Sequence, residues 1–325
     1  MSERPEGRGG LATVMQRIGR SQAAVIAVVI VVLSAAIAAV NPVFISLTNL
    51  FAIMLQSSVT AIATMCMVLL MVSGGLDFSI GSIISLSCVV MAKLIGAGYG
   101  AALTALIGIA IATACGLING LIVAKSRCPP IIITLGMLYV YHGLALNVAE
   151  GKFLSLGGKF ELLGSSRLWL IPVPVLIAVA VALLTWTLLI YVKYGRRLVA
   201  IGGNEDAAFL AGINIDFHKI TAYTLNGLIA GLAALVLVSR LGSVISTVGA
   251  DYALRALSAA VIGGVSFQGG KGTVGGAILG VILLGVVYNA MNILGISSYY
   301  QSIVLGAIVV AAVVFSNLGA LRMRR

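Results

Sequence analysis

AALTALIGIAIATACGLINGLIVA, residues 101–124, contains no charged side chain. A helix of about 20 mostly apolar residues can cross the hydrocarbon core of a bilayer. This stretch is therefore predicted to span a membrane, and similar runs recur along the whole chain. The expected fold class is an all-α polytopic membrane protein with about ten spans, near residues 23–40, 49–72, 80–95, 101–124, 130–149, 171–192, 219–239, 252–267, 273–292 and 299–318.

The composition supports a membrane domain and excludes a large soluble one. Hydrophobic residues make up 61% of the 325 residues and charged residues only 9%, whereas about a quarter of a soluble domain is charged. We expect a cytoplasmic tail at 1–22, a transmembrane domain at 23–320 with a cytoplasmic loop at about 193–218, and a cytoplasmic tail at 321–325. The net charge of +11 lies mostly in short loops, so it indicates membrane orientation and no nucleic-acid partner.

The positions of the basic residues predict that both termini are cytoplasmic. Loops on the cytoplasmic side of a membrane carry an excess of Lys and Arg. An alternative for 23–40 is a cleaved signal peptide, because arginines precede it and Ala36-Ile37-Ala38 resembles a cleavage site. We favour a span, because the run is long enough and many spans follow. The predicted inner basic residues are Arg4, Arg8, Arg17, Arg20, Lys125, Arg127, Lys193, Arg196, Arg197, Lys219, Lys271, Arg322, Arg324 and Arg325.

A few polar residues interrupt the apolar runs. Asp77 lies in SGGLDFSIGS, residues 73–82. A carboxylate at membrane depth is costly unless it is satisfied or functional, so Asp77 either caps the next helix or contacts a gate or solute. Asn119, Asn289 and Asn292 also lie within predicted spans. Their amides either bond neighbouring helices or border a path for a neutral, hydroxyl-rich solute.

The sequence offers no sign of catalysis or of a cofactor held by this chain. No paired carboxylates, metal-ligand cluster or nucleophile constellation is visible in the 325 residues. The segment VSFQGGKGT, residues 265–273, imitates a phosphate-binding loop, which requires Gly, four residues, Gly-Lys and then Ser or Thr. Gly264 is one residue too far from the lysine, and Gly272 follows Lys271. A tight inner turn is the expected structure.

Several segments together resemble the ribose-type permease family of bacterial ABC importers. They occur in the family's order and cover the chain from about residue 45 to its end. The matching segments are SGGLDFSIGS (73–82), PPIIITLGML (129–138), YGRRLVAIGGNEDAAFLAGI (194–213), GADYALRALSAAVIGGVSFQGGKGTVGG (249–276) and NILGISSYYQSIV (292–304).

The resemblance implies a permease subunit with the ten-helix importer fold in the bacterial inner membrane. It implies no enzymatic activity in this chain, since ATP and Mg would bind a cytoplasmic ATPase whose two nucleotide-binding domains are usually fused. The other implied partners are a second permease copy or homologue, the surrounding lipid, and a periplasmic binding protein that delivers ribose or a related sugar or polyol. The segment that resembles the family's ATPase-coupling helix consists of Gly202, Gly203, Asn204, Glu205, Asp206, Ala207, Ala208 and Gly212.

The residues of the coupling segment agree with this assignment. It lies in the longest predicted inner loop, and Asn204 is a favourable helix N-cap. Glu205 and Asp206 would then occupy the first turn, where acids suit the helix dipole. Ala207, Ala208 and Ala211 would form a slim face for a groove on the ATPase.

Basic residues are also expected on the outer side, where they either dock an acidic edge of the binding protein or anchor the protein at the membrane interface. These residues are Lys152, Lys159, Arg240 and Arg255. Two other functions compete with an ABC permease. A secondary transporter would favour ionisable residues deep in the spans, and the chain offers little beyond Asp77 and His142. A membrane enzyme would need a catalytic constellation.

Overall fold

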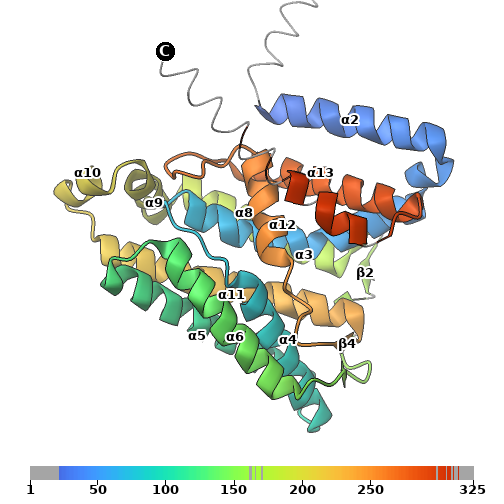
Figure 1. The fold of residues 1–325 in the computed structure, drawn as a ribbon, viewed down its shortest axis with the longest axis horizontal. Helices are drawn as coiled ribbons and strands as arrows, with labels where there is room; N and C mark the ends of the chain where they lie inside the picture. Colours follow the sequence, from blue (N-terminus) through green and yellow to red (C-terminus); the bar gives the residue numbers. More distant parts are fainter. Residues whose placement is uncertain are drawn as a thin grey trace, which may run out of the picture.

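The computed structural model describes residues 22–297 except 161, 162, 165 and 170, together with residues 299–304, 306–308, 310 and 314. Helices dominate this part of the chain (Figure 1). The helices are α2 (Gln22–Val40), a short 3-10 turn η1 (Pro42–Ile45), α3 (Leu47–Met71), α4 (Ile80–Gly96), α5 (Ala101–Ser126), α6 (Pro130–Ala149), α8 (Val173–Ile190), α9 (Lys193–Gly203), α10 (Glu205–Leu210), α11 (Ile215–Leu241), α12 (Tyr252–Ile262) and α13 (Val274–Ile293).

The predicted polytopic all-α class is confirmed, whereas the count of ten spans is not. Among the described residues, seven helices are long and apolar enough to cross a membrane: α2, α3, α5, α6, α8, α11 and α13. Two further predicted spans correspond to apolar helices below this length: 80–95 to α4, of 17 residues, and 252–267 to α12, of 11 residues. Much of the predicted span 299–318 and nearly all of both predicted tails lie outside the described residues.

The short length of α4 has a structural cause. After α3 ends at Met71, residues 72–79 turn back into the helix bundle, so α4 begins beside the interiors of α5 and α11. On the opposite side, residues 242–251 also run inward before α12, and the Gly249 N–H donates to Ser85 Oγ of α4 at 2.9 Å. Irregular backbone at membrane depth is tolerated where protein buries it. The predicted span 80–95 is thus helical throughout but follows a buried irregular segment, whereas only residues 252–262 of the predicted span 252–267 are helical.

Helix α11 occupies the centre of the bundle and packs against α3, α4 and α5. Its closest approach is to α5, where Gly116 and Gly227 face each other. A Cβ atom at Gly116 would overlap the Tyr223 carbonyl oxygen, and one at Gly227 would overlap the Ala112 carbonyl oxygen. Small residues of this kind let membrane helices approach until their backbones touch.

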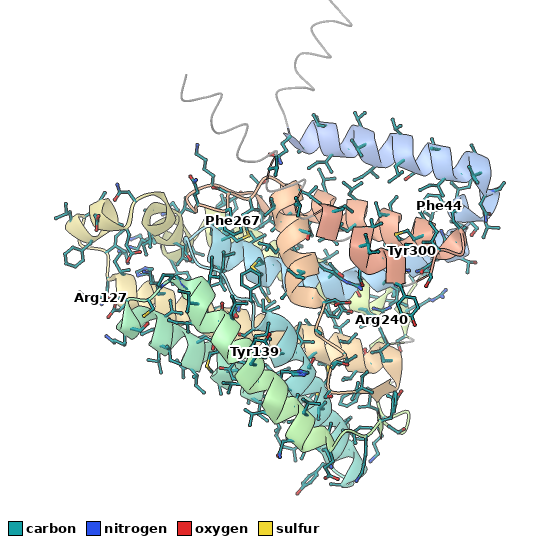
Figure 2. All side chains as sticks on the ribbon, viewed as in Figure 1. Phe44, Arg127, Tyr139, Arg240, Phe267 and Tyr300 are labelled. Carbon is teal, nitrogen blue, oxygen red and sulfur yellow. The ribbon has the colours of Figure 1, made fainter. Side chains whose placement is uncertain are left out.

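The two ends of the bundle differ. Helices α9 and α10 lie at one end, while the short strands lie at the other (Figure 1). Strand β1 (Leu154–Ser155) pairs antiparallel with β4 (Ser243–Val244), and β2 (Arg167–Leu168) pairs antiparallel with β3 (Ile171–Pro172). Figure 2 shows Arg127 near the α10 end and Phe44 at the far end. The α10 end is the end that the basic residues predict to be cytoplasmic.

Thiol labelling tests which end faces the cytoplasm. Three of the four native cysteines are buried, and the fourth, Cys128, is exposed. Cys128 lies in the turn between α5 and α6 near α10. We expect a membrane-impermeant maleimide to label Lys159→Cys in intact spheroplasts, because Lys159 is exposed at the strand end. Native Cys128 and Asn204→Cys should react only after permeabilisation. Labelling of Cys128 in intact spheroplasts would reverse the orientation.

Candidate functional site

The central polar feature is the fully buried carboxylate of Asp77, which accepts four hydrogen bonds. Asp77 Oδ1 accepts from the Ser79 backbone N–H at 2.8 Å and from the Ser79 hydroxyl at 2.6 Å. Asp77 Oδ2 accepts from Asn226 Nδ2 at 2.8 Å and from Asn119 Nδ2 at 3.3 Å. These donors offset the large cost of removing a carboxylate from water.

A second ring of hydrogen bonds extends this cluster to α6 and α11. The Tyr141 hydroxyl lies 2.9 Å from both Asn119 Oδ1 and the Cys115 carbonyl oxygen. The Tyr223 hydroxyl donates to the Leu76 carbonyl oxygen at 2.8 Å. We call Asp77, Ser79, Asn119, Tyr141 and Asn226 the Asp77 cluster. It joins the inward turn before α4 to α5, α6 and α11. Among the described residues, no side-chain hydrogen bond caps α4, whose N-cap residue is Ser79, so Asp77 connects segments and does not supply the expected cap.

The structure places the other predicted path residues elsewhere. Asn289 on α13 forms a reciprocal amide pair with Asn49 on α3, with N···O distances of 2.8 and 3.0 Å. Asn292 is exposed and accepts a hydrogen bond from Gln301 Nε2 at 2.8 Å. Asp77 and Asn119 therefore meet, whereas Asn289 and Asn292 belong to the contact between α3, α13 and the segment that follows α13.

The predicted coupling segment forms the end of α9 and all of α10. Asn204 caps α10 as expected, since its side chain accepts from the Ala207 N–H at 2.9 Å, and Glu205 and Asp206 occupy the first turn. Of the predicted slim alanine face, Ala207 and Ala211 are exposed and Ala208 is not. Ala208 is buried, while the neighbouring Phe209 and Leu210 are 69% and 85% exposed.

An ion pair ties α10 to α11. Lys219 Nζ lies 2.7 and 2.8 Å from the two carboxylate oxygens of Glu205. Lys219 is in the second turn of α11, and Asn226 of the Asp77 cluster follows seven positions later on the same helix. The surface helix and the buried carboxylate are thus connected through one rigid element.

Three sequence motifs converge at the other end of the coupling segment. The Gly270 N–H donates to the Val72 carbonyl oxygen at 3.0 Å. Gly202, at the end of α9, fits into the same contact. A Cβ atom there would overlap the Val72 carbonyl oxygen and lie 2.7 Å from Gly270 N and 2.9 Å from Gly74 N. We call Val72, Gly74, Gly202 and Gly270 the glycine junction.

The predicted tight turn around Lys271 is confirmed, because the Ser266 N–H donates to the Lys271 carbonyl oxygen at 2.9 Å.

Two cavities flank α10. The larger, of about 990 Å³, lies between α10 and the α5–α6 turn and is lined by Arg127, Glu205, Asp206, Phe209 and other residues. The smaller, of about 300 Å³, reaches from Asn204 to the Ser73–Gly75 turn. This end therefore presents a hollowed surface that is both charged and apolar, which suits a protein partner.

The predicted outer basic residues fall into two groups. Lys152 is exposed and pairs with Glu150 at 2.6 Å, and Glu150 also pairs with Lys93 at 2.8 Å. Hydrogen bonds from these two ammonium groups lower the pKa of Glu150 to about 2, so its carboxylate is ionised at physiological pH. Lys159 is exposed as well, whereas Arg240 and Arg255 are partly buried.

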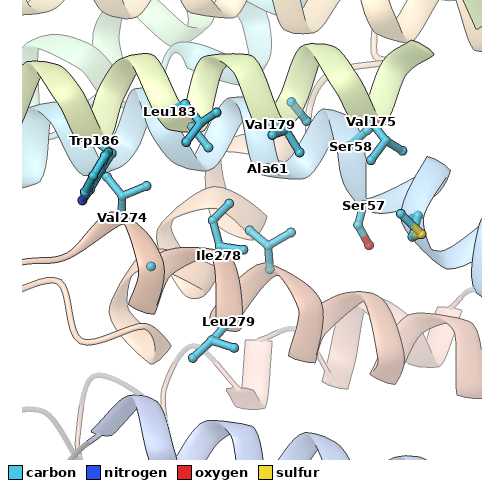
Figure 3. A pocket seen from close by; sticks show the side chains of 15 residues that line it. Ser57, Ser58, Ala61, Val175, Val179, Leu183, Trp186, Val274, Ile278 and Leu279 are labelled. Carbon is cyan, nitrogen blue, oxygen red and sulfur yellow. The ribbon is translucent and has the colours of Figure 1, made fainter. Parts of the chain in front are cut away.

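A cavity of about 440 Å³ lies between α3, α8 and α13 (Figure 3). Its lining is apolar apart from Ser57 and Ser58, and Trp186 lies at one end. Burying hydroxyl groups without hydrogen-bond partners is unfavourable. This cavity is therefore unsuited to a sugar, although Ser57 at its other end directs its hydroxyl toward α13 (Figure 3).

Replacing Asp77 tests whether its carboxylate stabilises the fold. Asp77→Asn would turn one of its acceptor atoms into a donor that faces other donors. We expect the free energy of unfolding to fall by about 1–3 kcal/mol, seen as a lower melting temperature of the purified protein. Asp216→Asn is the matched control, because Asp216 forms an exposed ion pair with Lys125 and such pairs contribute about 0–1 kcal/mol. Unchanged stability of Asp77→Asn would refute a structural role for the carboxylate.

Comparisons with known proteins match almost the whole chain. Residues 49–313 match the family described as the branched-chain amino acid transport system permease component. The chain is 37% identical over 295 residues to the ribose import permease protein of Escherichia coli strain K12, covering 89% of this chain and 92% of that protein. It is 36% identical over 307 residues to the ribose import permease protein of Bacillus subtilis strain 168, covering 94% of each.

A third relative is the D-allose transport system permease protein of Escherichia coli strain K12, which is 36% identical over 278 residues, or 85% of each chain. No solved structure matches this chain. The resemblance inferred from the sequence motifs is thus confirmed, and the chain belongs to the branched-chain amino acid transport system permease family, as a relative of ribose and allose import permeases.

Proposed function

We propose that this chain is the permease subunit of an ATP-driven, binding-protein-dependent importer of a monosaccharide in the bacterial inner membrane. The solute would be ribose or a related sugar or polyol, because the relatives are named as ribose and allose permeases. The observation that carries the proposal is the glycine junction. Gly202, in the segment that would face the cytoplasmic partner, lies there in backbone contact with the turn that leads to Asp77.

The partner at the α10 end would be an ATPase that holds ATP and Mg. Phe209 and Leu210 give α10 an apolar tip, and the 990 Å³ cavity lies beside it. Gly202, Gly203, Glu205, Asp206, Ala207 and Gly212 would form or border the same contact, while Ala208 packs inward. Movement of this surface would press Gly202 against Val72 and Gly74, since no free space separates them. Energy would thus reach the buried turn mechanically.

The partner at the strand end would be a binding protein that delivers the solute. Lys152 and Lys159 are exposed there and would attract an acidic edge, because complementary charges raise encounter rates. Arg240 and Arg255 would contribute less to docking, since both are partly buried. A second permease copy or homologue would complete the transporter. Asp77 and Asn119 would control the route from within the bundle, and Asn289 and Asn292 would border it at the α13 side.

Reconstitution tests the proposal directly. Proteoliposomes that contain this chain and its cognate ATPase should accumulate labelled D-ribose or D-allose when the binding protein and ATP are supplied. The control is an ATPase whose phosphate-binding lysine is replaced, which should abolish uptake because the proposal assigns ATP binding to the ATPase. Uptake that follows an ion gradient in the absence of the ATPase would favour a secondary transporter instead.

Two adjacent glycines test the coupling route. Gly202→Ala would overlap the Val72 carbonyl oxygen, whereas a Cβ atom at Gly203 meets no atom within 4 Å. Overpacking costs about 1–3 kcal/mol, so Gly202→Ala should reduce substrate-stimulated ATP hydrolysis and uptake by about tenfold. Gly203→Ala is the matched control and should behave as wild type.

The same measurements separate docking from coupling. Gly202→Ala should still copurify with the ATPase, because it leaves the exposed tip of α10 unchanged. A Phe209→Ser, Leu210→Ser double variant should lose the ATPase and keep its own melting temperature, since both side chains are exposed. Wild-type ATP hydrolysis in Gly202→Ala would show that the signal does not pass through the glycine junction.

A further inference from the structure

Helices α3, α12 and α13 enclose a small polar cavity toward the strand end of the bundle. It is lined by Gln56, Ser57 and Thr60 from α3, Arg255 from α12 and Tyr288 from α13, with apolar residues around them. Its volume is about 10 Å³, which accommodates roughly one water-sized oxygen. The cavity is separate from the Asp77 cluster, and the apolar cavity of Figure 3 shares Ser57 and Val281 with it.

Three buried polar atoms at this cavity have no hydrogen-bond partner among the described residues. They are Ser57 Oγ, Arg255 Nε and the Tyr288 hydroxyl oxygen. Buried polar groups nearly always have a partner, so unpaired groups require an explanation. The adjacent Ser58 behaves in the ordinary way, because its hydroxyl donates to the Leu55 carbonyl oxygen at 2.7 Å. Unpaired polar atoms are therefore a feature of this cavity and not of α3 as a whole.

Neighbouring contacts hold these groups in place. The Arg255 guanidinium pairs with Asp251, four positions earlier, at 3.3 Å, and its central carbon lies 4.6 Å from the centre of the Tyr288 ring. Gly285 on α13 leaves room for the Ser57 hydroxyl, because a Cβ atom there would overlap Ser57 Oγ. Groups fixed in this way lose little freedom when they bind a ligand.

The charge balance indicates the class of ligand. Asp251 already neutralises Arg255, so the site has no net charge that would favour an anion. It offers an N–H donor together with two hydroxyl groups, each of which both donates and accepts. A sugar hydroxyl matches this set, since its oxygen can accept from Arg255 Nε–H and its proton can be donated to Ser57 or Tyr288. The Arg255 side chain is 24% exposed, so it extends from the protein surface to its buried Nε atom at the cavity.

We propose that Ser57, Arg255 and Tyr288 form a contact point for a hydroxyl group of a neutral, polyhydroxylated solute during its passage. The inference rests on the proposed function and adds the residues of this chain that touch the solute. It gives Arg255 a role in the solute route instead of binding-protein docking.

The test uses the reconstituted complex with D-ribose and D-allose as probes. Ser57→Ala and Tyr288→Phe each delete one unpaired oxygen, and Arg255→Lys removes the Nε donor but keeps the charge. Each variant should lower uptake per ATP hydrolysed roughly two- to tenfold, the factor expected for one neutral hydrogen bond. Ser58→Ala, the matched control, should transport as wild type.

Protein stability distinguishes solute contact from a structural role. Because Ser57 Oγ and the Tyr288 hydroxyl bond no described residue, Ser57→Ala and Tyr288→Phe should leave the melting temperature unchanged or higher while uptake falls. If the wild-type complex is active and both variants take up the probes as fast as it does, this inference is overturned while the proposed function is unaffected. A melting temperature that falls together with uptake would also overturn it. A wild-type complex that moves neither probe under any condition would count against the proposed function itself.

Discussion

The structure depends on keeping one carboxylate satisfied inside a bundle of apolar helices. Asp77 has no contact with solvent, and its four hydrogen bonds come from its own turn, from α5 and from α11. Donors from three segments can converge on one group only if the turn before α4 lies deep in the bundle. That requirement explains why residues 72–79 turn into the bundle before α4 begins, and why α11 is central. The cluster thereby fixes the relative positions of helices that are distant in the sequence.

Much of this architecture could be predicted from hydrophobic runs, because apolar length reports directly on the capacity to span a bilayer. The same measure could not show that irregular segments precede α4 and α12 inside the bundle, or that α12 ends at Ile262, since hydropathy records how apolar a residue is and not the conformation of its backbone. Asp77 and Asn119 could be singled out because polar groups at membrane depth are rare. Their partner Asn226 is also a polar residue within a predicted span, but no local sequence pattern shows that its side of the helix faces Asp77.

The glycine junction shows a second limit of sequence reasoning. Gly74, Gly202 and Gly270 lie in three separate motifs, and each motif alone reads as a turn. Only their packing reveals that the backbone of α9 touches the other two segments. Ala208 departed from the predicted face of α10 for a related reason, because its burial is set by tertiary contacts and not by the helical period, whereas Ala207 and Ala211 are exposed as predicted. Likewise, nothing in the sequence distinguishes Ser57 from Ser58, although the Ser58 hydroxyl has a hydrogen-bond partner and the Ser57 hydroxyl has none among the described residues.

The close contact between α5 and α11 limits how the protein can deform. Where Gly116 and Gly227 meet, carbonyl oxygens of each helix occupy the space that a side chain would need on the other. Helices interlocked in this way cannot slide along each other without steric overlap, so α5 and α11 form one rigid body. The Glu205–Lys219 ion pair sits at one end of this body and the Asp77 hydrogen bonds lie at its middle. Helices α5 and α11 together therefore have the geometry of a lever. A small tilt imposed at the α10 end turns the centre of the bundle through the same angle.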